Sequence, residues 1–454
     1  MKYDCDQIKA IEALGNTLVI AGAGSGKTST IIGKVDYLIK NNLYKRDEIL
    51  IISFTNESVN SIKDKLKHKV DVSTFHKLAL NILKDNITEI SNDYDLKYII
   101  REYLLSYATH NKKTKVIYNR LLKNSNLDEL VNLIFSFINI YKSNYSNIDT
   151  LFNLYNKSIF TNKYYFKLIL DIYIVYLREL ESSNKHDFND LIINATKLIN
   201  ENKVTLKYKF VIIDEFQDSS LIRFNLVKAI INKTNGNLFV VGDDYQSIYR
   251  FSGCDLGLFI NFKSYLKDAN TIFLNNNYRN NQSLIDIANN FIMKNKHQIK
   301  KKTFCHKDSF KPIKIVFYKD RQKSLEKLLT KINGNVLILG RNNIDKDNFN
   351  VIENKNIRFL TVHKSKGLEE DNVIIINLYN SRLGFPSLIK NHQILNKILT
   401  NDYIIHEEER RLFYVALTRS KNNVYLLTPV NNYSVFIREL IWNYQEKIEI
   451  INID

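Results

Sequence analysis

The sequence predicts an α/β fold, because three short apolar runs each end in residues suited to binding a ligand. The run at 16–20 (NTLVI) leads into the glycine-rich AGAGSGKT and then into the helix-like STIIGKVDYLI. The run at 209–213 (KFVII) ends in Asp-Glu, and the run at 237–241 (NLFVV) ends in Gly-Asp-Asp. In open α/β sheets, ligands bind at the carboxyl ends of the strands. These runs therefore predict strands that bring their polar ends to one site.

Residues 21–28 predict a phosphate-binding loop, since a strand precedes them and a helix follows. Glycines let such a loop turn tightly, so that its N–H groups converge on a β-phosphate at a helix N-terminus. Lys27 would reach the β- and γ-phosphates, and the Thr28 hydroxyl would hold Mg²⁺. A glycine-rich turn that binds no ligand is the alternative, but it does not explain Lys27 and Thr28 in register. The expected nucleotide-binding residues are Ala21, Gly22, Ala23, Gly24, Ser25, Gly26, Lys27, Thr28 and Ser29.

The polar ends of the later strands predict hydrolysis of the nucleotide. Asp214 would hold Mg²⁺ through water, and Glu215 would orient and deprotonate the attacking water. A kinase or a small GTPase needs no glutamate at this point. Gln246 follows the third run and is placed to sense a γ-phosphate. Arg279 and Arg419 are either surface ion-pair residues or neutralise charge on the γ-phosphate in the transition state.

The composition fits a protein that binds a polyanion. The chain has 454 residues, with 65 Lys and Arg against 48 Asp and Glu and a net charge of +17. This excess favours a nucleic-acid partner, and a solvated coat of lysines is the alternative. Three cysteines far apart show no metal-ligand or disulfide pattern, so we expect a cytoplasmic protein. The first residues lack an apolar signal core and 164–180 carries charged residues, so we expect no membrane contact.

Taken in order, the motifs of this chain resemble those of the superfamily 1 DNA helicases of the UvrD/Rep type. The resemblance runs from near the N-terminus to about residue 428 and comprises DCDQ (4–7), AGAGSGKT, SFTNESV (53–59), STFHKLAL (73–80), DFNDL (187–191), IIDEFQDSS (212–220), VGDDYQSIYRFSG (241–253), NYRN (277–280), FLTVHKSKGLEEDNVIII (359–376), LGFP (383–386) and RRLFYVALTRS (410–420). It implies two RecA-like P-loop NTPase cores with a helical insertion in the first. The expected ranges are 1–81 with 186–275 for the first core, 82–185 for the insertion and 276–454 for the second core.

The resemblance also implies an activity: an ATP-dependent translocase or helicase that uses ATP and Mg²⁺. Its expected substrate is single-stranded DNA or a tailed duplex, with 3′-to-5′ movement. The positions that match the hydrolytic core are Lys27, Thr28, Asp214 and Glu215, and those that match the γ-phosphate sensors and fingers are Gln246, Arg279 and Arg419. Gln7 matches a residue that contacts adenine, Tyr278 the ring that stacks on adenine, and Glu369 the carboxylate near the ribose. The matching strand-binding residues are Phe54, Thr55, Asn56, Thr74, Phe75, His76, Tyr249, Phe251, Thr361 and His363.

Four of these strand-binding residues have an alternative role. His76 and His363 could be core or capping histidines, and neither has metal-ligand spacing. Phe75 and Phe251 are either rings that stack on bases or aromatic residues of the core. The two roles differ in whether the side chain is exposed.

The chain departs from the UvrD/Rep pattern in several places. Ala21 stands where the loop pattern has glycine, Ser29 where relatives commonly carry a basic residue, and Ser252 where they carry arginine. The stretch from Arg279 to Thr361 is too short for the accessory domain of larger relatives, so we expect that domain to be missing. The expected helicase would act in DNA repair, replication or antiphage defence, where some compact relatives act beside a nuclease, as in Gabija-type systems. The alternative is a DNA-stimulated ATPase that regulates or feeds a partner such as a nuclease, with little unwinding alone. A P-loop enzyme that is no motor would require the later motifs to be accidental.

Overall fold

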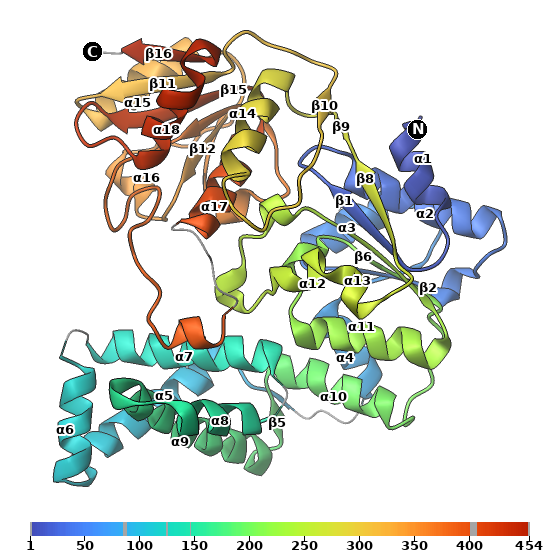
Figure 1. The fold of residues 1–454 in the computed structure, drawn as a ribbon, viewed down its shortest axis with the longest axis vertical. Coiled ribbons are helices and arrows are strands. Elements are labelled where there is room, and N and C mark those ends of the chain that lie inside the picture. Colours follow the sequence, from blue (N-terminus) through green and yellow to red (C-terminus); the bar gives the residue numbers. More distant parts are fainter. Residues whose placement is uncertain (1, 85–88, 124–125, 146, 400–405, 453–454) are drawn as a thin grey trace.

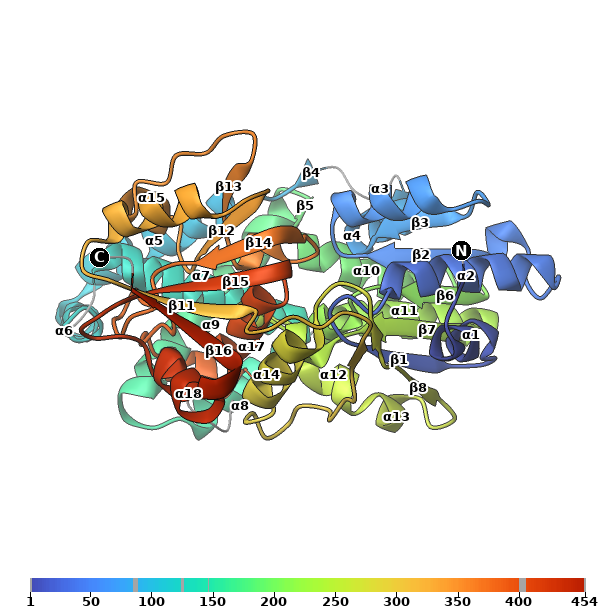
Figure 2. The same cartoon turned by 90° about the horizontal axis from the view of Figure 1, so that it is seen from above.

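Two parallel sheets and one group of helices make up the structure, a computed structural model (Figure 1). It describes residues 2–452 except 85–88, 124–125, 146 and 400–405. The two sheets have six strands each, and the two α/β units they form lie side by side (Figure 2). The predicted fold class, α/β with two RecA-like units, is confirmed. Among the described residues, no helix combines the length and the apolar character needed to cross a bilayer.

The first sheet has the strand order β3-β2-β6-β7-β1-β8, and its strands pair in parallel. Its strands are β1 (Thr17–Ala21), β2 (Ile49–Ser53), β3 (Asp71–Thr74), β6 (Phe210–Ile213), β7 (Asn237–Gly242) and β8 (Asn270–Leu274). Helices cover both faces of the sheet: α1 (Cys5–Glu12), α2 (Lys27–Lys40), α3 (Asn56–Lys65), α4 (Phe75–Leu83), α10 (Phe188–Asn200), α11 (Leu221–Thr234), α12 (Leu256–Ile260) and α13 (Phe262–Tyr265). Successive residues of a strand point to opposite faces, so Val19 packs in the core with α2 while Leu18 packs in the core with α10 and α11. Burial on both faces explains the unbroken apolar runs in the sequence.

The second sheet repeats this plan with the order β13-β12-β14-β15-β11-β16, again with parallel pairs. Its strands are β11 (Ile313–Tyr318), β12 (Val336–Gly340), β13 (Ile357–Thr361), β14 (Glu370–Ile375), β15 (Ser420–Pro429) and β16 (Ile448–Asn452). The helices of this unit are α14 (Gln282–Ile292), α15 (Arg321–Lys331), α16 (Asp345–Asn348), α17 (Glu407–Leu417) and α18 (Val435–Tyr444). The short strands β9 (Asn276–Asn277) and β10 (Phe304–Cys305) pair with each other beside it. Residues 279–361 are all described and form only parts of this unit, with no separate accessory domain among them.

Helices fill most of the stretch between α4 and α10, where the sequence predicts a helical insertion. They are α5 (Asp93–His110), α6 (Lys112–Leu121), α7 (Leu127–Asn144), α8 (Asp149–Lys157) and α9 (Phe160–Ser182). The two-residue strands β4 (Glu89–Ile90) and β5 (Lys185–His186) pair at the two ends of this stretch. The insertion is fastened to the first unit by a buried ion-pair cluster, in which Lys142 Nζ lies 2.6 Å from both Asp187 Oδ2 and Asp190 Oδ1. The division of the chain at 82, 186 and 276 stays a prediction.

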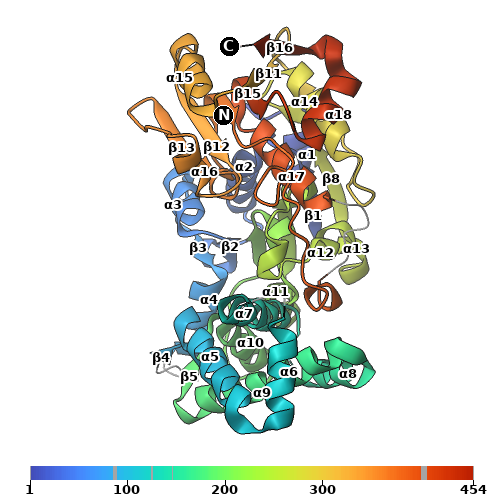
Figure 3. The ribbon, with the colours of Figure 1, turned by 90° about the vertical axis from the view of Figure 1, so that its left-hand side faces the viewer.

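The second unit also touches the helical insertion, through a segment we call the plug (residues 392–399). The plug leaves the second unit after β14 and runs down to α7 (Figures 1 and 3). Ile394 and Ile398 are buried in the core of the insertion, and the rings of His392 and Tyr165 meet edge to face with their centroids 4.8 Å apart. The insertion therefore contacts both units, although only the first is continuous with it in sequence.

The plug gives a prediction about stability. Ile394 has no exposed surface, so Ile394→Ala should lower the free energy of unfolding by about 2–5 kcal/mol through lost burial and the cavity it leaves. Ile389→Ala is the matched control, since Ile389 is 57% exposed in the same connection and should change stability by less than about 0.5 kcal/mol. Urea unfolding followed by circular dichroism measures both. Equal effects of the two substitutions would contradict a docked plug.

Candidate nucleotide and nucleic-acid sites

The loop between β1 and α2 is shaped to hold phosphate. Gly24 and Gly26 have φ angles of +71° and +80°, a backbone region that side chains rarely adopt. A Cβ on Gly24 would lie 2.6 Å from the Cβ of Arg279, and one on Gly26 would lie 2.5 Å from Gln7 Nε2. The first turn of α2 has no side-chain cap, so its N–H groups are free to bind an anion. Lys27 is the first residue of that helix.

Lys27 and the acidic end of β6 form an ion pair at this loop. Lys27 Nζ lies 2.8 Å from Glu215 Oε1, and Glu215 has a left-handed φ of +53° that turns its side chain back toward the loop. Burial opposes ionisation of Glu215, but the charges of Lys27 and Lys366 outweigh it and hold its pKa below the usual range. Burial and the charge of Glu215 raise the pKa of Asp214 to about 7. The two neighbouring carboxyls therefore differ: the cations around Glu215 favour its ionised form, and burial beside that charge favours the protonated form of Asp214.

The predicted metal residues fit Mg²⁺, which takes oxygen ligands, keeps several waters and needs only one or two carboxylates. Thr28 supplies a hydroxyl from the first turn of α2, and Asp214 supplies a carboxyl just after the end of β6. Two further buried oxygens, Ser53 Oγ and Asp218 Oδ1, have no hydrogen-bond partner among the described residues. Such oxygens are suited to accept hydrogen bonds from metal-bound water. No group of three or more His, Cys, Asp or Glu among the described residues could form a protein-only metal site.

Lys366 is a central residue that the sequence analysis missed. It follows η6 (His363–Ser365) of the second unit, and its Nζ donates to the Gln246 carbonyl oxygen at 2.8 Å. The same ammonium group pairs with Asp218 and lies 3.7 Å from Glu215 Oε2. One lysine of the second unit therefore contacts two carboxylates of the first. The available signal was its place in SKGLE, just past a strand end.

Gln246 joins the two units at the site. Its Nε2 donates to Asp243 Oδ2 at 2.6 Å, and its Oε1 accepts from Arg419 Nη2 at 3.0 Å. Arg419 is 1% exposed, and its Nε and Nη1 donate to the carbonyls of Val415 and Leu368. The predicted γ-phosphate sensor and the predicted arginine are thus in direct contact.

Arg279 and Glu369 also lie together. Arg279 Nε donates to Glu369 Oε2 at 2.7 Å, and its Nη1 donates to the Thr418 carbonyl at 3.2 Å. Lys421 Nζ lies 3.5 Å from the other carboxylate oxygen. The charges of Arg279 and Lys421 outweigh partial burial and lower the pKa of Glu369. Since Arg279 also borders Gly24, this pair lies beside the phosphate loop.

Gln7 and Tyr278 form the remaining corner of the nucleotide site. Gln7 is part of a capping box at the start of α1, and its Nε2 points at the Ser25 carbonyl at 3.4 Å. The Tyr278 N–H donates to the Gly24 carbonyl at 2.9 Å, and its hydroxyl donates to Asp4. The Tyr278 ring is 47% exposed and so is available to a ligand. The structure brings all the predicted nucleotide-binding residues around one loop.

The predicted strand-binding residues fall into two groups, and the prediction for Phe75 is wrong. Phe75 is 2% exposed in the core of the first unit, where its ring meets that of Phe54 at 5.4 Å, so it cannot stack on a base. Its position at the start of an amphipathic helix turns the ring inward. Thr74 and Thr55 accept hydrogen bonds from the first turns of α4 and α3 and so cap these helices. His76 packs edge-on against the ring of Phe188, and its pKa falls to about 4 because of burial and the charge of Arg223.

The second group brings aromatic rings to the boundary between the units, and one of them is exposed. Phe251, in η5 (Arg250–Ser252), is 57% exposed, and its ring lies 5.6 Å from that of His363 in the second unit. The Tyr249 hydroxyl donates to the His363 carbonyl at 3.1 Å. Burial and the charges of Arg341 and Lys366 lower the pKa of His363 to about 4, so this ring is neutral at pH 7. Thr361 ends β13 nearby and is 8% exposed. Asn56 begins α3 and is exposed.

The helical insertion supports this aromatic group. Asn144 Nδ2, at the end of α7, donates to the Gly253 carbonyl at 3.0 Å. Gly253 has a φ of +87°, and a Cβ there would lie 2.6 Å from the Cβ of Ser143. Only glycine permits this close approach of α7. The sequence analysis did not single out Ser143 or Asn144, because their role depends on a contact across more than one hundred positions of the chain.

Comparison with known protein families agrees with this geometry. Residues 4–267 match the model of the UvrD/REP helicase N-terminal domain, and residues 338–430 match that of the UvrD-like helicase C-terminal domain. The first match alone covers more than half of the 454 residues. The chain belongs to the UvrD/Rep helicase family. The second match begins in β12 and ends just after β15.

Similar proteins of this family carry helicase names. The chain is 28% identical to DNA helicase IV of Escherichia coli (strain K12) over 93% of its own length and 67% of that protein. It is 32% identical to the ATP-dependent DNA helicase Rep of Buchnera aphidicola subsp. Schizaphis graminum, over 73% of the chain and 50% of that protein. For the ATP-dependent DNA helicase PcrA of Staphylococcus epidermidis the identity is 30%, over 62% of the chain and 38% of that protein. The match thus spans only half or less of the Rep and PcrA proteins.

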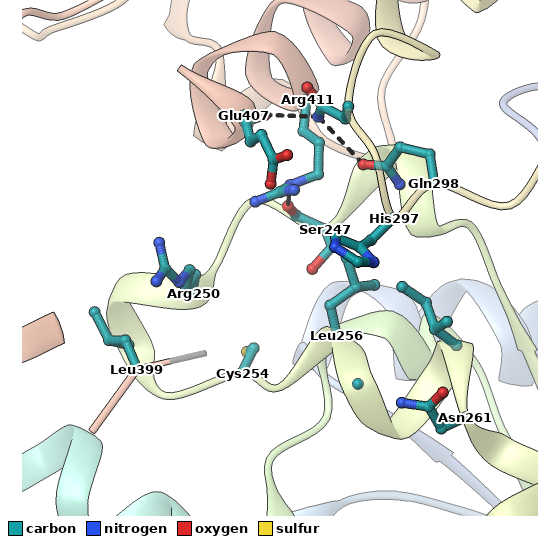
Figure 4. Close-up of a pocket in the computed structure, with 13 residues that line it drawn as sticks. Ser247, Arg250, Cys254, Leu256, Asn261, His297, Gln298, Leu399, Glu407 and Arg411 are labelled. Carbon is teal, nitrogen blue, oxygen red and sulfur yellow. Dashed lines mark hydrogen bonds between the residues drawn. The ribbon is translucent and has the colours of Figure 1, made fainter. Parts of the chain in front are cut away.

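A pocket of about 380 Å³ lies where the two units of this UvrD/Rep-family chain meet near the plug (Figure 4). Arg411 Nε donates to the Ser247 carbonyl at 2.8 Å across it, and Asn295 Nδ2 donates to the Glu407 carbonyl at 3.0 Å. Leu399 of the plug is also part of its wall. None of the predicted nucleotide-binding residues lines this pocket, so it is separate from the phosphate loop.

The raised pKa of Asp214 predicts a pH-dependent magnesium site. A protonated carboxyl cannot hold Mg²⁺, so the gain in ATP affinity from Mg²⁺ should shrink between about pH 8 and about pH 6. The raised pKa also affects the stability of the nucleotide-free chain. At pH values below the pKa that Asp214 has in the unfolded chain, its protonated carboxyl favours the folded state, and this contribution is lost as the pH rises through about 7. Calorimetric titration of ATP with Mg²⁺ or EDTA measures the first effect.

Asp214→Asn is the control for this experiment, because it removes the titration of Asp214 and leaves that of the γ-phosphate and of Asp218, whose pKa burial raises to about 6. Its magnesium-dependent gain should be small and should vary less with pH than that of the wild type. Parallel pH curves for the two proteins would show that Asp214 does not titrate in this range.

Proposed function

We propose that this chain is an ATP-dependent translocase or helicase on single-stranded DNA, with 3′-to-5′ movement. The single observation that carries the proposal is the bridge formed by Gln246, which binds Asp243 of the first unit and Arg419 of the second. A γ-phosphate beside Gln246 would compete for these hydrogen bonds, so the state of the nucleotide would change how the units meet. A motor needs such a link between chemistry and relative movement.

The residues of the site support hydrolysis of ATP in the following way. Lys27 leaves Glu215 and binds the β- and γ-phosphates, for which its charge and its place at the loop are suited. Glu215, released from Lys27, accepts a proton from the attacking water. Arg279 and Arg419 neutralise the charge that develops on the γ-phosphate. Thr28 and Asp214 hold Mg²⁺, which when bound neutralises charge on the phosphate oxygens.

The aromatic residues at the boundary support movement along a strand. Phe251 and His363 come from different units and lie at ring contact. If a base stacks on one of these rings, a shift of the other unit would therefore change the contacts of that base. The net charge of +17 supports binding of a polyanion such as a DNA strand.

A second function, a DNA-stimulated ATPase that regulates or feeds a protein partner such as a nuclease, is favoured by two observations. Residues 279–361 form no accessory domain, and Ser252 supplies no cation beside Phe251. Both would weaken the hold on a duplex. For either function the proposed pathway is DNA repair, replication or antiphage defence. The free state of all three cysteines fits a reducing cytoplasm for either function.

Glu215→Gln tests the proposed hydrolysis. The substitution keeps the shape of the side chain but removes the base, so ATP should still bind while turnover falls by about 10²-fold or more. Wild-type turnover should itself rise on addition of single-stranded DNA, because closure of the two units brings Arg419 to the nucleotide. Steady-state phosphate release with and without DNA measures both effects.

Glu326→Gln is the control for this variant, since Glu326 is an exposed carboxylate in α15 of the second unit and belongs to no motif of the sequence analysis. It should turn over as the wild type does. Near-normal turnover in Glu215→Gln would refute the assigned base. A basal rate that no length of DNA changes would refute the motor.

Phe251→Ala tests the proposed strand contact. Loss of a stacked base should weaken single-stranded DNA binding by about 1–3 kcal/mol, without a loss of folding, because the ring is 57% exposed. Phe310→Ala removes an 87% exposed ring elsewhere in the chain and should leave affinity unchanged. Fluorescence anisotropy with a labelled oligonucleotide at several salt concentrations gives the comparison. Equal affinities for the two variants would remove Phe251 from the strand site.

A further inference from the structure

His306 lies against the ring of Tyr278, at the exposed corner of the nucleotide site. The two ring centroids are 5.7 Å apart and the ring planes differ by 27°, which is a stacked arrangement. His306 belongs to no motif of the sequence analysis and lies outside both stretches that match the family models. Its position therefore calls for a separate explanation.

The pairing of β9 with β10 places the two rings together. In this parallel pair Phe304 lies beside Asn276, and Cys305 lies beside Asn277. The next residue of each strand is His306 on one side and Tyr278 on the other. A two-residue ladder contributes little stability by itself. Its evident consequence is to bring the imidazole to the tyrosine.

Hydrogen bonds on both sides hold the backbone at His306. The Phe304 N–H donates to the Asn275 carbonyl at 2.8 Å, and the Cys305 N–H donates to Gln282 Oε1 at 2.7 Å. The Lys307 carbonyl accepts from the Gln282 N–H at 2.8 Å. The His306 side chain is exposed, but its backbone is held on both sides. The imidazole ring therefore has fewer orientations open to it.

Tyr278 is held at three points, and 47% of its surface stays exposed. Its N–H is bound by Gly24, its hydroxyl donates to Asp4, and His306 covers part of its ring. A Cβ on Gly26 would lie 3.9 Å from Tyr278 Cε2, so the ring borders the phosphate loop. A base attached to a triphosphate in that loop would meet this ring.

The loop itself offers little for a base to stack on. The residue after Thr28 is Ser29, whose short side chain has no ring and no charge. Tyr278, which borders the loop and is exposed, is therefore the ring placed to stack on the base. A tyrosine that is fixed in orientation before binding loses less conformational entropy when the base arrives.

We propose that His306 is a positioning residue for the base of the nucleotide, which holds the Tyr278 ring so that its free face stacks on adenine. The inference rests on the proposed ATP-binding function and adds a residue to it. His306 acts through Tyr278 and not on the phosphates. Its effect is therefore confined to ligands that carry a base.

The test compares ATP with inorganic triphosphate, which fills the phosphate loop but has no base. Equilibrium binding of both ligands with Mg²⁺ is measured for the full chain and for His306→Ala, His306→Phe and His306→Gln. His306→Ala and His306→Gln should weaken ATP binding by about 2- to 10-fold, the scale of one aromatic contact. Triphosphate binding should not change, and His306→Phe should restore ATP binding because it keeps a ring.

His110→Ala is the matched control, since His110 is an exposed histidine at the end of α5 in the helical insertion. It should bind both ligands as the wild type does. In steady-state turnover, His306→Ala should raise the KM for ATP by a similar factor and leave kcat within about 2-fold.

Two results would overturn the inference. One is unchanged ATP binding by His306→Ala. The other is an equal loss for ATP and triphosphate, which would indicate a general disturbance of the loop. A wrong proposed function would give a different result. In that case the wild-type chain itself would not bind ATP or would not turn it over, whatever the variants do.

Discussion

The structure depends on pairing buried charges across the boundary between the two α/β units. Two lysines of the second unit, Lys301 and Lys366, have side chains that are only 5% and 9% exposed and pair with carboxylates of the first unit. Arg419 is buried beside them and donates to Gln246 of the first unit. Lys301 pairs with Asp243 and Asp244, and its pKa is raised because these carboxylates outweigh its burial. A buried charge without its partner costs several kcal/mol, about 3–5 when one partner is removed. The two units therefore cannot separate at this boundary without water or a ligand taking the place of each partner.

A nucleotide is a ligand of that kind. Its phosphates would bring negative charge to a boundary where Glu215, Asp218 and Asp243 now hold the cations. The same positive groups can then bind either the carboxylates or the phosphates, and the balance changes when the γ-phosphate is lost. The free energy of this exchange is the difference between the state in which the cations pair with carboxylates and the state in which they pair with phosphates. It is consequently much smaller than the energy of either state, which suits a reversible cycle.

Much of the fold and of the nucleotide site could be predicted from sequence, and the reason is local. The runs that form β1, β6 and β7 are strands because their residues are buried on both faces, and their order places polar ends at one edge. Lys366 and His306 could not be found in this way, since their roles come from contacts with residues far away in the chain. Phe75 shows the opposite failure. A motif position indicated a stacking ring, but the helix that it begins turns the ring into the core.

The plug gives the molecule a contact of a different kind from the charged boundary. Its buried residues, Ile394 and Ile398, make apolar contacts, which have no preferred direction and change in energy gradually as surfaces shift. Ion pairs, in contrast, are made or broken within a small displacement. The helical insertion is thus joined to the first unit by the rigid Lys142 cluster and to the second by a sliding surface. A rotation of the second unit that keeps Ile394 covered would therefore cost less free energy than one that exposes it.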